Sequence, residues 1–190
     1  IHHNTFHDIE SFGYGGWGLY TDEGSSEISM DHNLVYNTKD GSFHQHYGRD
    51  NHVTNNILVN SQIWQVRRSR VEDHRSFIFD RNIVYWTLDT PLLGSNWKDG
   101  GFDIDHNLYW HGKDFDFAGM SLDKWREMGK DRNSIIADPL FVDAAANDFR
   151  LREDSPAKQI GFETWDYTKA GRLTPRSLTK DMPSVPATYE

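Results

Sequence analysis

The hexapeptide Asp105-His106-Asn107-Leu108-Tyr109-Trp110 decides the fold, because near copies of it recur along the sequence. Each copy places an asparagine directly before an apolar run. These asparagines are Asn4, Asn33, Asn56, Asn82, Asn107 and Asn133, at steps of 29, 23, 26, 25 and 26 residues. A period of this length is typical of a solenoid, in which each repeat is one structural unit that stacks on the next.

The residues between the asparagines favour strands over helices. They are rich in Val, Ile, Phe, Tyr and Trp and alternate between apolar and polar, as at 27–31 and 102–105. The dense leucine pattern of leucine-rich repeats is absent, and helical repeats are longer. We therefore predict an all-β parallel β-helix with three short strands per coil. Its hand should be right-handed, because crossovers between parallel strands strongly prefer that hand.

The asparagines are expected to hold neighbouring coils together rather than to contact a substrate. Stacked strands lie about 4.8 Å apart. One asparagine per coil at the same corner would therefore form a ladder of side-chain amides that hydrogen-bond along the stack.

Composition limits the function classes. The 190 residues suit one domain with a long, thin core, and the net charge of −9 argues against binding nucleic acid or an anionic membrane surface through bulk electrostatics. No apolar stretch approaches the roughly 20 residues that span a bilayer. The chain has no cysteine and hence no disulfide.

The repeat predicts the domain organisation. Coils are expected over residues 1–165, with an inserted loop near 114–133, and residues 166–190 are expected to form an extended tail. Within the insert, Ser121 is the predicted N-cap of a short helix whose Leu122, Trp125 and Met128 pack on the stack. The sequence begins inside a repeat without a cap, which indicates the C-terminal portion of a longer helix.

Two neighbouring repeats carry the residues with chemical potential. In residues 15–26 the alternation points Tyr20 and Asp22 outward, and in residues 41–48 it points His44 and His46 outward. Both pairs, Tyr20 with His44 and Asp22 with His46, are separated by 24 residues, or one coil. We therefore expect Tyr20 to stack on His44 and Asp22 on His46, on one exposed parallel sheet.

Further residues extend this surface. The next coil would add Gln65 and Arg67 to the same column if the register holds. Trp17 and Tyr47 flank it, and Trp97 is predicted to be exposed to substrate. Core or corner packing is predicted for Trp64, Trp86 and Trp110.

This surface could form one of three kinds of site. His44 and His46 could bind a metal with Asp22, although no matching cysteine or second histidine pair supports this. A Ser-His-Asp hydrolase lacks a nucleophile-elbow motif. A carboxylate in a sugar-binding groove fits best, because sugar rings stack on aromatic side chains and carboxylates perform the acid, base or nucleophile work.

Several segments resemble a known group of proteins. These are Gly-Gly-Trp-Gly-Leu-Tyr-Thr-Asp-Glu-Gly-Ser-Ser at 15–26, and residues 33–38, 43–48, 136–141 and 154–157. They are similar to bacterial right-handed parallel β-helix proteins of the pectate-lyase-like superfamily, and in particular to glycoside hydrolase family 141. The resemblance covers nearly the whole chain. It implies exo-acting hydrolysis of plant or algal polysaccharide side chains, with α-L-fucosidase and xylanase activities known in the family.

The predicted catalytic residues are Asp22, Glu23 and His46. Neighbouring residues on a strand point to opposite faces, so Glu23 can serve as the second catalytic carboxyl group only if the strand ends or bulges at Asp22. Alternatively, a carboxyl group from preceding coils could be the second catalytic group. A polysaccharide lyase would use Arg67 or His46 as its base, and a non-catalytic sugar-binding solenoid would keep only the aromatics. If Asp22 and His46 stack, the pKa of Asp22 should fall and that of His46 should rise.

The remaining expectations concern the environment of the protein. We expect no cofactor and no metal at the site, with calcium the one ion left open. The partner should be a polysaccharide or oligosaccharide, without nucleic acid or membrane. The protein is expected to be a secreted or periplasmic monomer.

Overall fold

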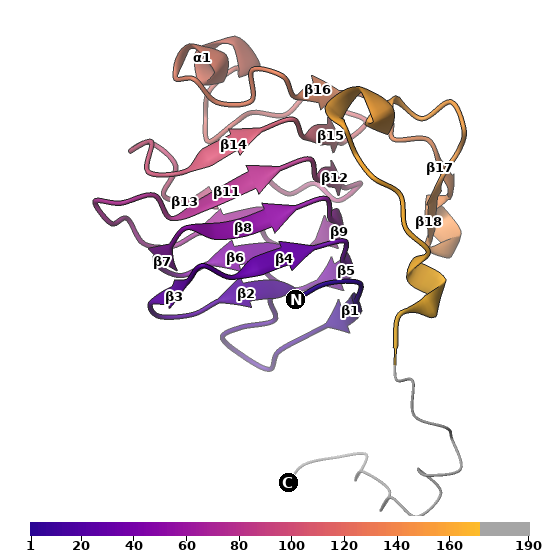
Figure 1. Ribbon diagram of the computed structural model, residues 1–190, viewed down its shortest axis with the longest axis horizontal. Coiled ribbons are helices and arrows are strands. Elements are labelled where there is room, and N and C mark those ends of the chain that lie inside the picture. Colours follow the sequence, from indigo (N-terminus) through magenta and orange to yellow (C-terminus); the bar gives the residue numbers. More distant parts are fainter. Residues whose placement is uncertain (172–190) are drawn as a thin grey trace, which may run out of the picture.

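The computed structural model describes residues 1–171 and shows a stack of parallel coils (Figure 1). Each full coil contributes one strand to each of three parallel sheets, which we name by their outermost strands. The β2–β13 sheet contains β2 (Leu19–Thr21), β6 (Phe43–Gln45), β10 (Val66–Arg68) and β13 (Leu93–Ser95). The β4–β14 sheet contains β4 (Ser29–Asp31), β8 (Asn51–Thr54), β11 (Phe77–Asp80) and β14 (Asp103–Asp105).

The third sheet, the β1–β16 sheet, has six strands. They are β1 (Thr5–Ile9), β5 (Leu34–Thr38), β9 (Ile57–Ser61), β12 (Ile83–Tyr85), β15 (Leu108–Trp110) and β16 (Ile135–Ile136). Two short strands, β3 (Ser25–Ser26) and β7 (Gly48–Arg49), form a further parallel pair. The prediction of an all-β parallel β-helix with three strands per coil is therefore confirmed, while its hand stays a prediction.

The asparagine ladder is present and lies directly before the β1–β16 sheet. The Asn33 amide donates to Oδ1 of Asn56 at 3.0 Å, and the Asn56 amide donates to Oδ1 of Asn82 at 3.0 Å. The same bond links Asn4 to Asn33 and Asn82 to Asn107. The backbone N–H of each asparagine also donates to the next Oδ1 along the stack. These buried amides satisfy one another and fix the register of the coils.

The predicted sixth member of the ladder is wrong by one residue. Asn133 is exposed, and its amide donates to Oδ2 of Asp105 at 2.7 Å. Ser134 instead occupies the position before β16, where its hydroxyl accepts from the backbone N–H of Asn107 at 2.8 Å. The inserted segment before β16 changes the spacing, so the repeat period no longer indicates the ladder position.

Helix α1 (Leu122–Glu127) lies at one end of the stack (Figure 1). Ser121 is its N-cap, as predicted, and Trp125 is fully buried against Phe102 and Phe117. Met128 is 39% exposed, so the predicted apolar stripe ends at Trp125. The helix thus covers the interior of the coils at this end.

Residues 137–171 run back along the outside of the coils (Figure 1). They contain β17 (Phe141–Asp143) and β18 (Asp148–Leu151), which pair antiparallel, and three short 3₁₀ helices: η1 (Ala144–Ala146), η2 (Pro156–Ile160) and η3 (Tyr167–Lys169). Phe141, Phe149 and Ile160 pack on outward-facing apolar residues of the β1–β16 sheet such as Ile57 and Ile83.

The coils therefore end near β16, whereas the sequence predicted coils as far as residue 165. The predicted tail from residue 166 begins with η3, and its part from 172 onward lies outside the described residues.

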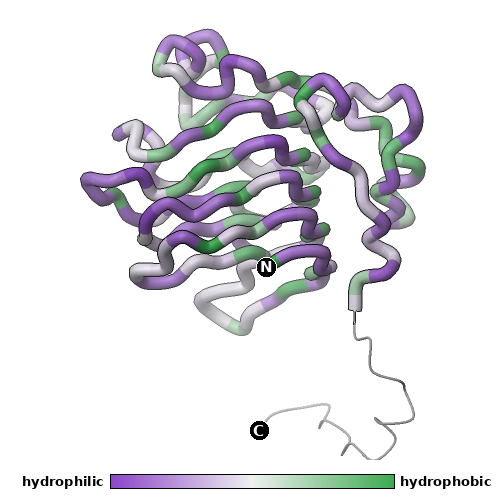
Figure 2. The backbone as a smooth tube through the Cα atoms, in the orientation of Figure 1, coloured by the Kyte–Doolittle hydropathy of each residue, from purple (hydrophilic) through white to green (hydrophobic). Residues whose placement is uncertain are grey.

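The interior of the coils holds a second, separate apolar cluster. Figure 2 shows hydrophobic and hydrophilic stretches alternating along each coil and lining up from coil to coil. Phe43, Phe77 and Phe79 are fully buried there, and each such side chain stabilises the fold by roughly 1.5–3 kcal/mol. None of the described helices has the length and apolar character needed to cross a membrane.

Candidate functional site

One column of side chains follows the outer face of the β2–β13 sheet. Tyr20 pairs with His44, His44 with Arg67, and Arg67 with Gly94 in the strand register. The stacking of Tyr20 on His44 predicted from the 24-residue offset is confirmed, with ring centroids 5.0 Å apart. Arg67 joins the column as expected.

The alternate residues of the same strands point into the coils. The Thr21 hydroxyl donates to Oε1 of Gln45 at 2.8 Å, and both side chains are buried. Arg68 follows Gln45 in register and is fully buried, where its Nη2 donates to Oδ2 of Asp99 at 3.0 Å and to Oγ of Ser76 at 2.9 Å. These internal bonds hold the backbone that presents the outer column.

Aromatic rings form one wall of the site. The Trp17 ring stacks on Tyr20 with centroids 4.2 Å apart and planes 29° apart, and it also contacts His44. Nε1 of Trp17 donates to Oδ2 of Asp40 at 3.3 Å. Both rings are half-buried, so the wall is fixed by packing yet reaches solvent.

His44 lies on the outer side of the sheet, but it is not exposed as predicted. The Trp17 ring and its neighbours cover it completely, and its Nε2 is hydrogen-bonded to the Ser69 hydroxyl. Burial, followed by the nearby Arg67 charge, lowers the pKa of His44 to about 3. His44 is therefore neutral at physiological pH. Its buried Nδ1 has no hydrogen-bond partner among residues 1–171.

Asp22 is exposed at the end of β2, next to the aromatic wall. The Tyr20 hydroxyl donates to its Oδ1 at 2.8 Å. This bond, then one from the backbone N–H of Glu23, and more weakly the charge of His46 hold the pKa of Asp22 below its ordinary value. The predicted lowering is confirmed, but its main cause is Tyr20 rather than His46.

Glu23 and His46 lie side by side at the end of the aromatic wall. Nε2 of His46 lies 3.8 Å from Oε1 of Glu23, so His46 contacts Glu23 rather than stacking on Asp22 as expected. Strand β2 ends at Thr21, which meets the condition under which Glu23 can lie beside Asp22. Tyr47 completes the group, with its ring against His46 and under the Arg70 guanidinium.

Asp40 is a site residue that the sequence reasoning missed. It is buried and forms an ion pair with Arg67, and it also accepts the Trp17 hydrogen bond. Its place 23 residues after Trp17, one coil further on, is the signal that could have identified it. Because Asp40 offsets the charge of Arg67, the column carries less free positive charge than its sequence suggested.

Besides His44, two further predicted substrate-binding residues are buried. Gln65 sits at the corner before β10, where its amide bonds the Ser61 backbone and the Thr90 hydroxyl. Trp97 follows β13 where the chain turns inward, and its Nε1 donates to the Gly94 carbonyl at 2.7 Å inside the core. The predicted exposure of both is wrong, because strand alternation does not extend past the ends of short strands.

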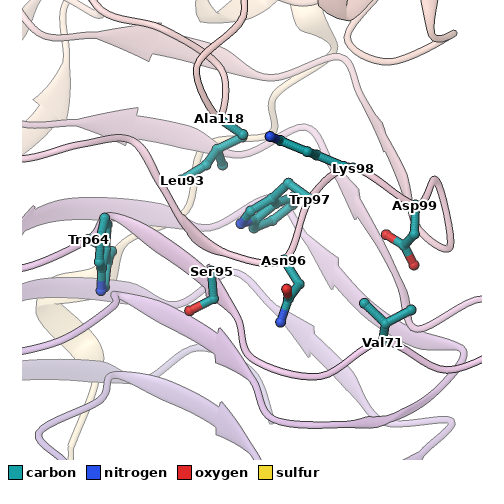
Figure 3. Close-up of a pocket in the computed structure, with 9 residues that line it drawn as sticks. All are labelled: Trp64, Val71, Leu93, Ser95, Asn96, Trp97, Lys98, Asp99 and Ala118. Atoms are coloured by element: carbon teal, nitrogen blue, oxygen red, sulfur yellow. The ribbon is translucent and has the colours of Figure 1, made fainter.

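A hollow lies on the same sheet beside β13 (Figure 3). It has a volume of about 540 Å³ and is lined by Trp64, Val71, Leu93, Ser95, Asn96, Trp97, Lys98, Asp99 and Ala118. Trp64, which the sequence reasoning assigned to packing, is half-buried at its edge.

A histidine–aspartate group suited to a metal lies elsewhere. Ligand atoms of His3, Asp31 and His32 all lie within 4.8 Å of one another, beside the start of the asparagine ladder. In residues 1–171, His44 and His46 do not belong to a group of this kind, and their ring centroids are 6.5 Å apart. The metal-binding alternative for the site column is therefore not supported.

Comparison with known proteins adds little about function. No family model matches the sequence, and no solved structure matches it. The uncharacterized protein YwoF of Bacillus subtilis (strain 168) is 27% identical over 199 aligned residues, which cover 77% of this chain and 41% of YwoF. The chain therefore spans less than half the length of this relative. The β-helix agrees with the fold implied by the resemblance to glycoside hydrolase family 141, whereas membership of that family stays a prediction.

Proposed function

We propose that the protein is a glycoside hydrolase that acts on plant or algal polysaccharide, with its site on the outer face of the β2–β13 sheet. One observation carries the proposal: Asp22, held ionised by Tyr20, lies beside the Trp17–Tyr20 aromatic wall and next to the Glu23–His46 pair. An aromatic surface beside carboxylates is the combination that glycosidic bond cleavage needs.

The two carboxyl groups have different surroundings and hence different roles. Because its pKa is lowered, Asp22 stays ionised further into the acidic pH range than an ordinary aspartate. This suits a nucleophile or a stabiliser of the oxocarbenium-like transition state. Glu23 lies next to His46, which can orient it or exchange a proton with it. In this assignment Glu23 protonates the leaving oxygen while Trp17 holds the sugar ring.

The charges around the column support a hydrolase over a lyase. A lyase needs a base and a cation that neutralises the uronate carboxylate. Arg67, one of the two bases named for a lyase, is already paired with Asp40, and His46, the other, lies 3.8 Å from the carboxyl group of Glu23. His44 is neutral and covered. The carboxyl groups beside Arg67 and His46 leave both poorly placed to receive an acidic sugar.

Turnover by matched variants tests the proposal. Wild-type protein, Asp22→Asn and Glu23→Gln would be incubated with fucosylated and xylose-based plant and algal polysaccharides, and released sugars would be quantified. Asp154→Asn is the control, because Asp154 is an exposed acid among residues 137–171, which pack on the β1–β16 sheet. We expect each site variant to lose at least about 10²-fold in turnover, with Asp154→Asn unchanged.

Two outcomes would reject the assignment. Wild-type turnover by Asp22→Asn would show that Asp22 is neither the nucleophile nor the stabiliser of the transition state. Ultraviolet-absorbing unsaturated products would identify a lyase instead. Because a polysaccharide of this kind lies outside the cell, we also propose that the protein acts outside the cytoplasm. Its monomeric state stays a prediction.

A further inference from the structure

We infer that the hollow beside Trp64 is a second sugar-binding subsite, so that the substrate is an oligosaccharide chain lying along the stack from Trp17 to Trp64. This inference rests on the proposed function and defines its substrate. Neither the resemblance nor the relative assigns a role to this hollow.

The first argument is position. Tyr20, His44, Arg67 and Gly94 occupy four successive coils of one sheet, and the hollow lies at the Gly94 end. Trp17 precedes β2 and Trp64 precedes β10, two coils further on, so about 10 Å along the stack separates the two aromatic surfaces. One coil interval of about 4.8 Å is close to the length of one sugar residue in an extended chain, so a chain of about three residues spans both surfaces.

The second argument is that Gly94 makes room for Trp64. A Cβ atom on Gly94 would lie 2.4 Å from Cγ and 2.5 Å from Cδ2 of the Trp64 ring. Every other member of the column carries a large side chain, and only at Gly94 does the sheet leave space for an indole to lie against it. A half-buried indole held flat on a sheet is a rigid surface on which a sugar ring can stack.

The third argument is the polar lining. Asn96 and Lys98 line the hollow beside Trp64 and supply an amide and an ammonium group for sugar hydroxyls (Figure 3). The Asn96 amide donates to the Ser69 carbonyl at 2.6 Å, and the Ser69 hydroxyl is bonded to His44. One residue, Ser69, therefore links the hollow to the centre of the site column.

A site of this length has a consequence for substrate choice. An enzyme that removes only a terminal side-chain sugar gains nothing from a contact two coils away. A subsite at Trp64 adds binding energy only to chains long enough to reach it. Affinity should therefore rise with chain length up to the size that spans both aromatic surfaces.

Binding to an array of plant and algal oligosaccharides of two to six units tests this. The full chain would carry Asp22→Asn, so that binding is measured without turnover, and would be compared with the same chain carrying Trp64→Ala or Gly94→Ala. Phe12→Ala is the control for loss of an exposed aromatic outside the hollow. Urea unfolding of each variant would show whether the fold is kept.

We expect Trp64→Ala to lower the affinity for the longest bound oligosaccharide by about tenfold or more, and to leave the affinity for disaccharides unchanged. Gly94→Ala should have the same effect, because it displaces the indole without removing it. Phe12→Ala should bind as the parent does.

Equal affinity of Trp64→Ala and its parent for every bound oligosaccharide would overturn the inference, as would a lack of binding to the whole array. The two proposals can fail separately. If Asp22→Asn keeps wild-type turnover while Trp64→Ala weakens binding, the chemistry is wrong and the subsite stands. If Asp22→Asn abolishes turnover while Trp64→Ala binds normally, only the subsite is wrong.

Discussion

At the scale of single residues, the site depends on how Tyr20 and Asp22 share one hydrogen bond. The Tyr20 hydroxyl donates to Asp22, and this bond is the largest cause of the lowered pKa of Asp22. Burial, followed by the bond to Asp22, raises the pKa of Tyr20. The tyrosine therefore stays protonated and keeps donating, while the aspartate stays charged across the neutral range.

Replacing this donor should change the pH dependence of turnover. Tyr20→Phe removes the main cause of the lowered pKa, so the pKa of Asp22 rises towards its ordinary value of 3.8. Turnover that requires ionised Asp22 would then begin to fall at a higher pH than in the wild type. The measurement is the acid limb of the kcat/KM profile.

Tyr36→Phe, on the β1–β16 sheet, is the matched control and should leave the profile unchanged. An acid limb at the same pH in Tyr20→Phe and wild type would show that Asp22 is not the group whose ionisation limits turnover.

Sequence reasoning succeeded for residues within strands and failed for those just outside them. Tyr20, His44 and Arg67 were placed correctly because alternation and the coil period hold inside β2, β6 and β10. Gln65 and Trp97 lie beside strand ends, where corner hydrogen bonds and core packing decide the direction of the side chain. His44 shows a further limit. Strand alternation predicts that its side chain points outward, but it does not predict that the Trp17 ring covers this side chain.

At the scale of elements, the corner before the β1–β16 sheet is the most regular part of the molecule. The residue that precedes the ladder asparagine has a left-handed backbone, with φ of 52° at His32, 56° at Asn55 and 53° at Arg81. Asparagine, aspartate and histidine are enriched at positive φ, although arginine gains no such benefit. The ladder bonds stabilise this turn in each coil. The regular spacing of the asparagines in the sequence therefore predicts the position of the turn.

The ladder should contribute measurably to stability. Asn82→Ala leaves the buried backbone N–H of Asn56 without its acceptor and takes one acceptor from the Asn56 side-chain amide, which keeps its bond to the Met30 carbonyl. It also removes the Asn82 bond to the Val53 carbonyl. Unsatisfied buried groups make the expected loss on the order of 3 kcal/mol in the free energy of unfolding, measured by urea denaturation.

Asn133→Ala is the matched control, because the sequence pattern gives both residues the same role while the structure places Asn133 on the surface. Its effect should stay within about 0.5 kcal/mol. Equal losses in the two variants would contradict the observed one-residue shift at the end of the ladder.

At the scale of the whole molecule, two of the outer faces of the coils differ: one is covered by the chain itself, and the other carries the candidate site. Residues 137–171 cover the outside of the β1–β16 sheet and pack on it through the apolar cluster that contains Phe141, Phe149 and Ile160 (Figure 1). The β2–β13 sheet carries the aromatic wall and the Glu23–His46 pair on its outer side, and the hollow lies beside β13 at the end of the same sheet. The repeat period predicted the stack but not the returning segment, because that segment has no period of its own and its partners are outward-facing residues of distant coils.

The central claim is that a sugar chain binds along the outer face of the β2–β13 sheet. The most direct measurement is a crystal structure of Asp22→Asn with a bound oligosaccharide of four to six units. The account predicts electron density for the sugar chain that runs across successive coils, with one ring on Trp17 and another on Trp64. An oligosaccharide bound instead to the β4–β14 sheet, or against residues 137–171, would contradict the account.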